Sequence, residues 1–344
     1  MKKYLSENPF QLENGAVLPG LEIAYHTYGD FRPGRPVVWV CHALTANSEV
    51  FEWWPGLFGE EELFNPNVYS VICANVLGGC YGTTGPLSLD PRNGQPWYHG
   101  FPEITIRDMV KAHRLLADAL GIDRIDLLVG GSLGGQQAIE WAIEEPERFR
   151  RLALIATNAQ HSPWGIAFNE SQRMAIASDP TWKTSTPRAG TEGLKAARAM
   201  ALLSYRSYHA YHTAQSESDL LLPETFRAAS YQHHQGEKLA RRFNAYSYNL
   251  LSRAMDSHCV GRGKNGNKQA LQRITAHTLV VGIASDLLFP VSEQEYLAAH
   301  IPDANLVIID SLYGHDGFLI ETAQLSALLK LFLINQSIEF SYGH

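Results

Sequence analysis

The stretch that decides the fold is Ile125-Asp126-Leu127-Leu128-Val129-Gly130-Gly131-Ser132-Leu133-Gly134-Gly135. It begins as a short apolar run over 125–129, typical of a buried strand, and passes into helical spacing over 134–145. Within it, residues 130–134 fit G-x-S-x-G, in which small neighbours let a nucleophilic serine occupy a sharp strand-to-helix turn. The bare pattern is common by chance. Its place between a strand and a helix favours a nucleophile over a purely structural glycine turn.

Similar apolar runs continue on both sides of this stretch, at 37–41, 68–73, 152–156, 278–283 and 306–310. Runs without polar alternation predict parallel strands that are covered on both faces. Helical patterns at 104–120 and 134–145 lie between strands, which indicates an α/β fold with a mostly parallel central sheet.

The strand pattern stops between about 160 and 275, where helical stretches such as 191–205 and 237–255 take over. A helical block between strands of one sheet is typical of a cap over a site. We therefore predict a core formed by residues 1–160 and 276–344, and an inserted helical cap at 161–275.

Composition excludes several classes of protein. The 344 residues are 45% hydrophobic and 18% charged, with a formal net charge of −7, so nucleic acid is not an expected partner. No apolar run is long enough to span a membrane, and no signal peptide is expected at the start. The four cysteines and 14 histidines show no metal-ligand spacing, so we expect no metal site and a cytoplasmic location.

A serine nucleophile needs a base and an orienting carboxylate, which follow it in the chain order Ser, Asp, His on this kind of scaffold. Asp286 comes directly after the strand at 278–283, and His315 comes after the strand at 306–310. Both therefore belong to the sheet edge that carries Ser132. Asp310 and Asp316 are weaker candidates for the carboxylate. The histidines of the cap region, such as His161, His233 and His258, are interpreted as packing or surface residues.

The oxyanion of an acyl-transfer intermediate needs two backbone N–H donors. Leu133, directly after the serine, is expected to supply one of them. The second is expected from the loop after the strand at 37–41, where Leu44 is the candidate. In the same loop, His42 either contacts the site or only holds the loop, and the sequence does not decide between these roles.

Several longer motifs accompany this constellation. They are His42-Ala43-Leu44-Thr45, Leu77-Gly78-Gly79-Cys80-Tyr81-Gly82-Thr83-Thr84-Gly85-Pro86, Thr105-Ile106-Arg107-Asp108-Met109-Val110, Gly130-Gly131-Ser132-Leu133-Gly134-Gly135, Ala254-Met255-Asp256, Val260-Gly261-Arg262-Gly263, Ser285-Asp286-Leu287-Leu288-Phe289-Pro290 and Gly314-His315-Asp316. With them, the chain resembles the homoserine O-acetyltransferase family, an acyltransferase branch of the α/β-hydrolase fold, over roughly residues 20 to 330.

The resemblance implies acetyl transfer from acetyl-CoA to the hydroxyl of L-homoserine by a ping-pong mechanism, as a step of methionine biosynthesis. It implies a triad of Ser132, Asp286 and His315, and oxyanion donors at Leu44 and Leu133. Acetyl-CoA is then a substrate, and no resident cofactor is expected. The resemblance also implies a homodimer joined through the cap.

For the acceptor, the resemblance implies that Arg198 binds the carboxylate, Tyr205 lines the tunnel and Asp316 binds the ammonium. From its residue type alone, the sequence favours a solvated helix arginine at Arg198 over a substrate-binding one. The loop after His42 departs from the family pattern at Ala46-Asn47 and is followed by an aromatic stretch at 50–55. A succinyl donor, a serine acceptor, and a serine esterase or thioesterase with the same triad therefore remain as alternatives. So does a fold member that binds without catalysing.

Overall fold

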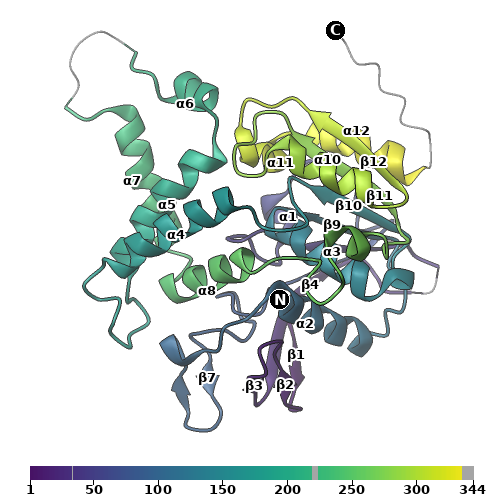
Figure 1. Ribbon diagram of the computed structural model, residues 1–344, viewed down its shortest axis with the longest axis horizontal. Helices are drawn as coiled ribbons and strands as arrows, with labels where there is room; N and C mark the ends of the chain where they lie inside the picture. Colours follow the sequence, from purple (N-terminus) through teal and green to yellow (C-terminus); the bar gives the residue numbers. More distant parts are fainter. Residues whose placement is uncertain (33, 219–223, 335–344) are drawn as a thin grey trace.

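The computed structural model describes residues 1–32, 34–218 and 224–334, and its centre is an eight-stranded sheet (Figure 1). Within that range, the strands of this sheet are, in the order in which they lie side by side, β1 (Lys2–Ser6), β4 (Leu21–Tyr28), β6 (Ser70–Ala74), β5 (Val37–Cys41), β9 (Leu127–Gly131), β10 (Arg151–Ile155), β11 (His277–Ile283) and β12 (Ala304–Ile309). The six strands from β6 to β12 are parallel, whereas β1 and β4 are antiparallel to their neighbours.

Alternate side chains of the parallel strands enter two separate cores, one on each face of the sheet. In β5, Trp39 joins the core that contains α2 and α3, whereas Val38 and Val40 join the core that contains α1 and α12. Because both faces are covered, both sets of positions are apolar, which explains why the strands read as continuous hydrophobic runs. The core helices are α1 (Val50–Trp53), α2 (Ile106–Ala119), α3 (Leu133–Glu144), α9 (Asn267–Leu271), α10 (Val291–His300), α11 (Gly317–Ile320) and α12 (Thr322–Leu333).

Helix α2 illustrates how local sequence sets these elements. Thr105 caps its first turn, since the Thr105 hydroxyl accepts from Asp108 N while the Asp108 carboxylate accepts from Thr105 N. Its apolar face packs on the sheet through Met109, Val110 and Leu116. Gly121, with φ of 66°, follows the last turn and ends the predicted helical segment.

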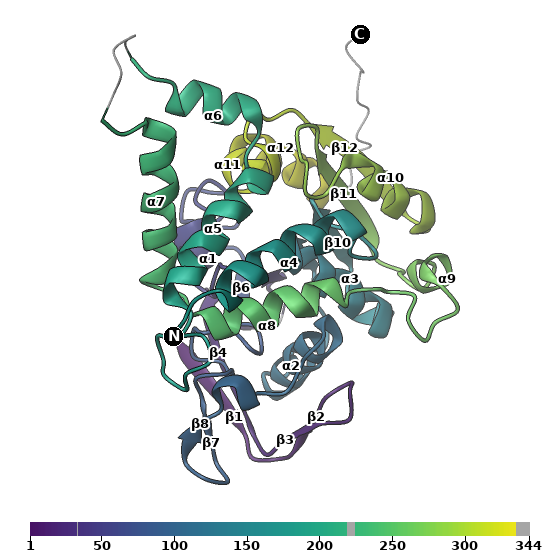
Figure 2. The same cartoon turned by 60° about the vertical axis from the view of Figure 1, so that its left-hand side comes forward.

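Between β10 and β11 the chain leaves the sheet and forms the cap helices, which project from one side of the core (Figures 1 and 2). These helices are α4 (Pro163–Ala177), α5 (Thr191–Tyr205), α6 (Tyr208–Gln215), α7 (Arg227–Ala240) and α8 (Ala245–Asp256). The predicted helix over 191–205 is confirmed as α5. The prediction of one helix over 237–255 is wrong, because α7 ends at Ala240 and Asn244 caps a new helix, its Oδ1 accepting from Ser247 N.

Two short hairpins lie outside the main sheet. They pair β2 (Phe10–Gln11) with β3 (Val17–Leu18), and β7 (Leu89–Asp90) with β8 (Gln95–Pro96). No helix within the described ranges is long and apolar enough to cross a membrane.

Candidate active site

Ser132 occupies a strained turn between β9 and α3, with φ of 57° and ψ of −125°. A non-glycine residue rarely adopts positive φ, and surrounding structure must hold it there. Here the Ser132 N–H donates to the carbonyl of Ile155 at 3.0 Å, and its own carbonyl accepts from the Thr157 hydroxyl at 2.9 Å. The neighbouring strand β10 and the loop after it therefore fix the backbone on both sides of a serine that is only 6% exposed.

Gly134 allows the start of α3 to touch the end of β5. A Cβ atom at this position would lie 2.0 Å from the carbonyl oxygen of Cys41, a distance that no side chain can adopt. Since Cys41 leads directly into the loop that contains Leu44, this close approach brings that loop to the helix start that carries Leu133.

Leu44 and Leu133 are both buried, and within the described part of the chain neither backbone N–H donates a hydrogen bond. Two unpaired amides on converging loops are a suitable donor pair for a developing oxyanion. The Leu133 amide also belongs to the first turn of α3, where the helix dipole favours negative charge.

His42 holds the loop in place. Its Nδ1 donates to the carbonyl of Ala43 at 2.9 Å, and its Nε2 accepts from Val76 N at 3.1 Å. Burial lowers the pKa of His42 to about 4, so the ring is neutral near pH 7. Of the two roles left open by the sequence, these bonds favour anchoring the loop after β5 to the loop after β6.

The structure pairs His315 with Asp286, which come from the loops after β12 and β11. The distance between His315 Nδ1 and Asp286 Oδ2 is 2.6 Å. The second oxygen of Asp286 accepts from the backbone N–H groups of Leu288 at 2.8 Å and Phe289 at 2.9 Å. Because an ionised carboxylate can only accept, Nδ1 carries the proton, and Nε2 of neutral His315 is left as a base.

Aromatic rings fix the orientation of the His315 imidazole. Phe289 stacks on it with ring centroids 5.1 Å apart, and Phe318 approaches by its edge at 5.3 Å. Tyr205, at the end of cap helix α5, lies at 5.8 Å. Figures 1 and 2 both show the C-terminal end of α5 next to α11, the helix that follows His315. The His315 imidazole is therefore packed between core and cap.

Arg198 lies in the cap, on α5, and contacts Tyr205. Its guanidinium is 5.5 Å from the centroid of the Tyr205 ring, the same ring that contacts His315. No carboxylate of the described residues lies within 4.0 Å of Arg198. Burial raises the pKa of the Tyr205 phenol, which therefore stays protonated and can donate. An unpaired guanidinium beside a phenol can bind an anion such as a carboxylate.

Asp316 follows His315 directly, and its carboxylate already has a cationic partner. Arg206 Nε lies 2.7 Å from Asp316 Oδ2, and the two side chains are 26% and 13% exposed. The sequence did not indicate Arg206. It comes directly after Tyr205, and only the contact between cap and core brings it to Asp316.

A second residue that the sequence did not indicate is Glu293, in the first turn of α10. Burial raises its pKa to about 7, and the nearby charge of Asp286 acts in the same direction, against hydrogen bonds from Asn158 and Ser162 that lower it. Asn158 in turn accepts from Gln136 of α3 at 3.0 Å. Glu293, Asn158 and Gln136 therefore form a group of polar side chains close to Asp286.

The other histidines of this region do not approach His315. His161 and His258 are buried, and burial lowers their pKa values to about 4 and about 3. His233 is exposed on α7, and so is the alternative carboxylate Asp310 at the end of β12. Among the residues that the structure describes, no group of three or more His, Cys, Asp or Glu side chains could hold a metal ion.

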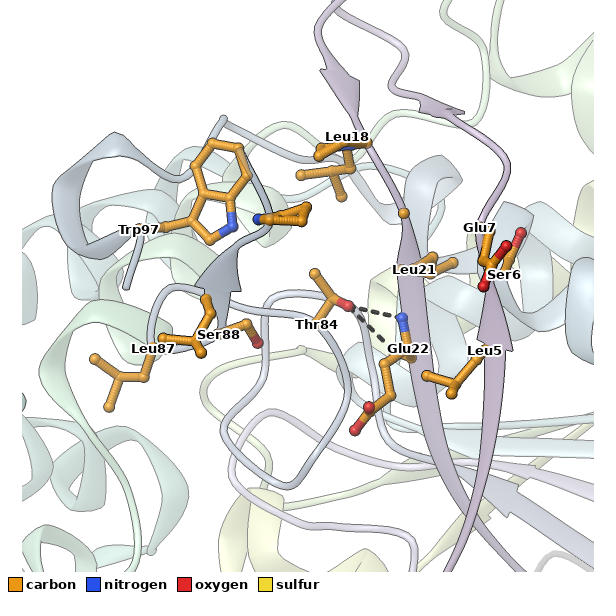
Figure 3. Close-up of a pocket in the computed structure, with 14 residues that line it drawn as sticks. Leu5, Ser6, Glu7, Leu18, Leu21, Glu22, Thr84, Leu87, Ser88 and Trp97 are labelled. Carbon is orange, nitrogen blue, oxygen red and sulfur yellow. Dashed lines mark hydrogen bonds between the residues drawn. The ribbon is translucent and has the colours of Figure 1, made fainter. Parts of the chain in front are cut away.

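A cavity of about 710 Å³ lies elsewhere, between β1, the start of β4 and the segment 84–97 (Figure 3). Its wall is mostly apolar and includes Leu18, Leu21 and Trp97. The Thr84 hydroxyl accepts from Glu22 N at 2.8 Å and joins the glycine-rich segment to β4, as the dashed lines in Figure 3 show. None of the predicted site residues lines this cavity, so it is separate from the candidate active site.

Comparison with known proteins agrees with this architecture. Residues 36–322 match the family model described as alpha/beta hydrolase fold. The chain is 44% identical over 335 residues to a homoserine O-acetyltransferase of Cyclobacterium marinum, a match that covers 97% of this chain and 95% of the relative.

Two solved structures have the same overall fold. Homoserine O-acetyltransferase from Bacillus anthracis superposes with a TM-score of 0.89 at 23% identity, covering 99% of this chain and 98% of that one. Esterase E22 superposes with a TM-score of 0.85 at 20% identity, covering 96% and 99%. The predicted α/β-hydrolase fold is confirmed. Since the fold accommodates both a transferase and an esterase, it does not by itself define the reaction.

Proposed function

Because this chain belongs to the homoserine O-acetyltransferase family, a group of acyltransferase enzymes with the α/β-hydrolase fold, we propose that it transfers an acetyl group from acetyl-CoA to the hydroxyl of L-homoserine. The observation that carries the proposal is the sequence of contacts from Asp286 through His315 and Tyr205 to Arg198. It joins a base to a cation in the cap that has no carboxylate partner among the described residues.

In the first half-reaction, His315 Nε2 accepts the proton of the Ser132 hydroxyl as the serine oxygen attacks the thioester carbonyl. The carbonyl oxygen becomes an oxyanion, and the N–H groups of Leu44 and Leu133 stabilise it. The C–S bond then breaks, His315 returns the proton to the sulfur, and CoA leaves as a thiol. The acetyl group stays on Ser132 as an ester. Asp286 keeps His315 oriented and stabilises its protonated form.

In the second half-reaction, the acceptor hydroxyl replaces CoA. L-Homoserine carries a carboxylate and an ammonium, so its site needs a fixed cation and a fixed anion. Arg198 supplies a guanidinium for the carboxylate, and Asp316 supplies the anion for the ammonium. Held by its carboxylate and its ammonium, the acceptor presents its hydroxyl to His315, which removes the proton as the oxygen attacks the acetyl-serine. The ester bond to Ser132 then breaks, and His315 returns the proton to the serine oxygen. The product is O-acetyl-L-homoserine, a methionine precursor.

An acyl-enzyme survives only if water stays away from it. Ser132 is 6% exposed and His315 is 3% exposed, with cap residue Tyr205 against the base. This enclosure supports transfer over hydrolysis. We propose no resident cofactor, since Ser132, His315 and Asp286 supply the nucleophile, the base and its orienting carboxylate, and acetyl-CoA is consumed as a substrate.

We also propose a homodimer joined through the cap and a cytoplasmic location. Large apolar side chains on cap helices are more than half exposed in the single chain, namely Trp164, Met174, Leu203 and Tyr208. Burying such side chains against a second copy would remove them from water. All four cysteines are free thiols, as is usual in a reducing compartment. Light scattering during gel filtration would test the dimer.

The decisive experiment measures CoA release with a thiol reagent. Acetyl-CoA and succinyl-CoA are each tested with L-homoserine, with L-serine and without an acceptor. Release from acetyl-CoA that depends on homoserine is the expected result. A preference for succinyl-CoA or for serine would keep the mechanism but change the substrate. Equal release without an acceptor would replace the transferase by an esterase or thioesterase.

The Ser132→Ala variant tests the covalent step, because it should abolish both the acyl-enzyme seen by mass spectrometry and labelling by a fluorophosphonate. Ser292→Ala is the matched control, since Ser292 is exposed on α10. Near-normal turnover by Ser132→Ala would contradict the assignment. A wild-type chain that no fluorophosphonate labels would indicate a binding protein without catalysis.

A further inference from the structure

The carboxylate of Asp316 is occupied by an arginine of this same chain. Arg206 Nε lies 2.7 Å from Asp316 Oδ2, and both side chains are only partly exposed. No other cationic side chain of the described residues lies within 4.0 Å of Asp316, and Arg206 has no second carboxylate in that range. Arg206 is therefore the counter-ion of Asp316 in the free enzyme.

The backbone around this ion pair is held by several independent contacts. Gly314, with φ of 63°, lies so close to the turn between α5 and α6 that a Cβ atom there would be 3.0 Å from Ser207 N. The Ser207 hydroxyl donates to the carbonyl of Leu312. The Arg206 guanidinium also lies 5.9 Å from the ring centroid of Tyr313. The ion pair is thus part of a well-packed contact between the cap and the loop that carries His315.

The charges of this region suit an incoming amino acid. Arg198 and Arg206 are two cations, and Asp316 is one anion, so these three side chains together carry one positive charge in excess. A carboxylate can bind Arg198 without displacing a protein group. The ammonium finds no free carboxylate at Asp316, because Asp316 is already paired with Arg206.

We propose that Arg206 limits the affinity of the site for its acceptor by competing with the α-ammonium of the acceptor for the carboxylate of Asp316. The inference rests on the proposed function, in which Asp316 binds that ammonium. A cation can replace Arg206 at Asp316, or share the carboxylate with it against their mutual repulsion. A neutral alcohol or a water molecule carries no positive charge, so it does not displace Arg206 from Asp316.

The test removes the competing charge. In Arg206→Gln, Asp316 is free for the ammonium, so the dissociation constant of L-homoserine should fall about two- to five-fold, the range that partly exposed ion pairs contribute. The comparison ligand is 4-hydroxybutanoate, which has the same hydroxyl and carboxylate but no ammonium, and its dissociation constant should not change. Both are measured by calorimetry on the Ser132→Ala background, where no turnover occurs.

Two further variants complete the design. Arg206→Lys keeps the positive charge and should bind homoserine close to the wild-type value. Arg206→Met removes the charge with a side chain of similar length, in case the glutamine variant does not fold, and should behave as Arg206→Gln. In an otherwise wild-type enzyme, Arg206→Gln should likewise lower the KM for homoserine two- to five-fold.

The opposing outcomes are distinct. If Arg206 binds the acceptor carboxylate, Arg206→Gln will weaken both ligands equally, which overturns the proposal. Unchanged homoserine affinity in a folded variant also overturns it, since the ion pair is then only structural. A wild-type enzyme that releases no CoA in response to homoserine is a different failure, because it overturns the proposed function and the inference with it.

Discussion

The ring of Phe318 fills the space that any side chain at position 131 would need. A Cβ atom built on Gly131 would lie 2.7 Å from two carbons of that ring, and the His315 ring also contacts it, with ring centroids 5.3 Å apart. Phe318 is itself held, because Trp54 Nε1 donates to its carbonyl at 3.0 Å. The residue before Ser132 and the imidazole of His315 are thus separated by one aromatic ring.

Gly131→Ala should therefore disturb the base through Phe318. We expect a loss of about 1–3 kcal/mol in the free energy of unfolding from overpacking, and a lower rate of acyl-enzyme formation. Urea denaturation and the rate of CoA release measure the two effects. Gly100→Ala is the control, since a Cβ atom there meets nothing within 4 Å. Wild-type rates in Gly131→Ala would show that the position of Phe318 does not matter for His315.

Asp286→Asn should slow both half-reactions by about 10²- to 10⁴-fold, because an amide can stabilise neither the protonated imidazole nor the tautomer that leaves Nε2 free. The measurement is the rate of acetyl-serine formation after rapid mixing with acetyl-CoA. Asp310→Asn, at an exposed position after the neighbouring strand, should be close to wild type. Equal loss in the two variants would argue for a general effect on the fold.

Arg198→Gln should raise the KM for homoserine by about 10- to 100-fold, since a hydrogen bond to a charged group contributes about 1.5–3 kcal/mol. Acetyl-CoA consumption in the first half-reaction should change little. Arg188→Gln, also in the cap but exposed, serves as the matched control. If the donor half-reaction is lost instead, Arg198 acts on CoA rather than on the acceptor.

Glu293 should make the enzyme less stable as the pH rises. Its pKa is near 7 in the folded chain and near 4.5 in the unfolded chain, so the folded state binds the additional proton between these values. The stabilisation is present below about pH 4.5 and is lost as the pH rises to about 7. Glu293→Gln removes this loss, and it should be more stable than wild type by about 1–3 kcal/mol at pH 8, with little difference at pH 5.

Urea denaturation at the two pH values measures this effect, with Glu295→Gln as the control from the exposed side of the same helix. A pH dependence that persists unchanged in Glu293→Gln would show that Glu293 is not its source.

Local patterns predicted the elements that local physics determines. The turn at Ser132 and helix α5 follow from glycine placement and helical periodicity, both of which are visible in a few consecutive residues. The break between α7 and α8 was missed because no glycine or proline marks it. Its signal was the N-cap at Asn244, which a search for apolar periodicity ignores.

Contacts between segments that are distant in the chain could not be predicted from local sequence patterns. The antiparallel strands β1 and β4 at the sheet edge were not predicted, because neither is a continuous apolar run. β1 is mostly exposed, and polar Glu22 and His26 interrupt β4. The ion pair of Arg206 and Asp316 joins the end of a cap helix to a loop of the core. Neither local sequence indicates that the two side chains meet.

The pairing of β10 with β11 also has a consequence for how the enzyme is made. The two strands are parallel neighbours, with Arg151 opposite His277, although the whole cap lies between them in the chain. Closing a loop of that length costs about 4 kcal/mol of chain entropy, so β11 joins the sheet late. During synthesis, Ser132 leaves the ribosome well before Asp286 and His315. A nascent chain therefore holds a serine without its base, which is an unreactive alcohol, and chemistry begins only once translation has delivered the last two strands.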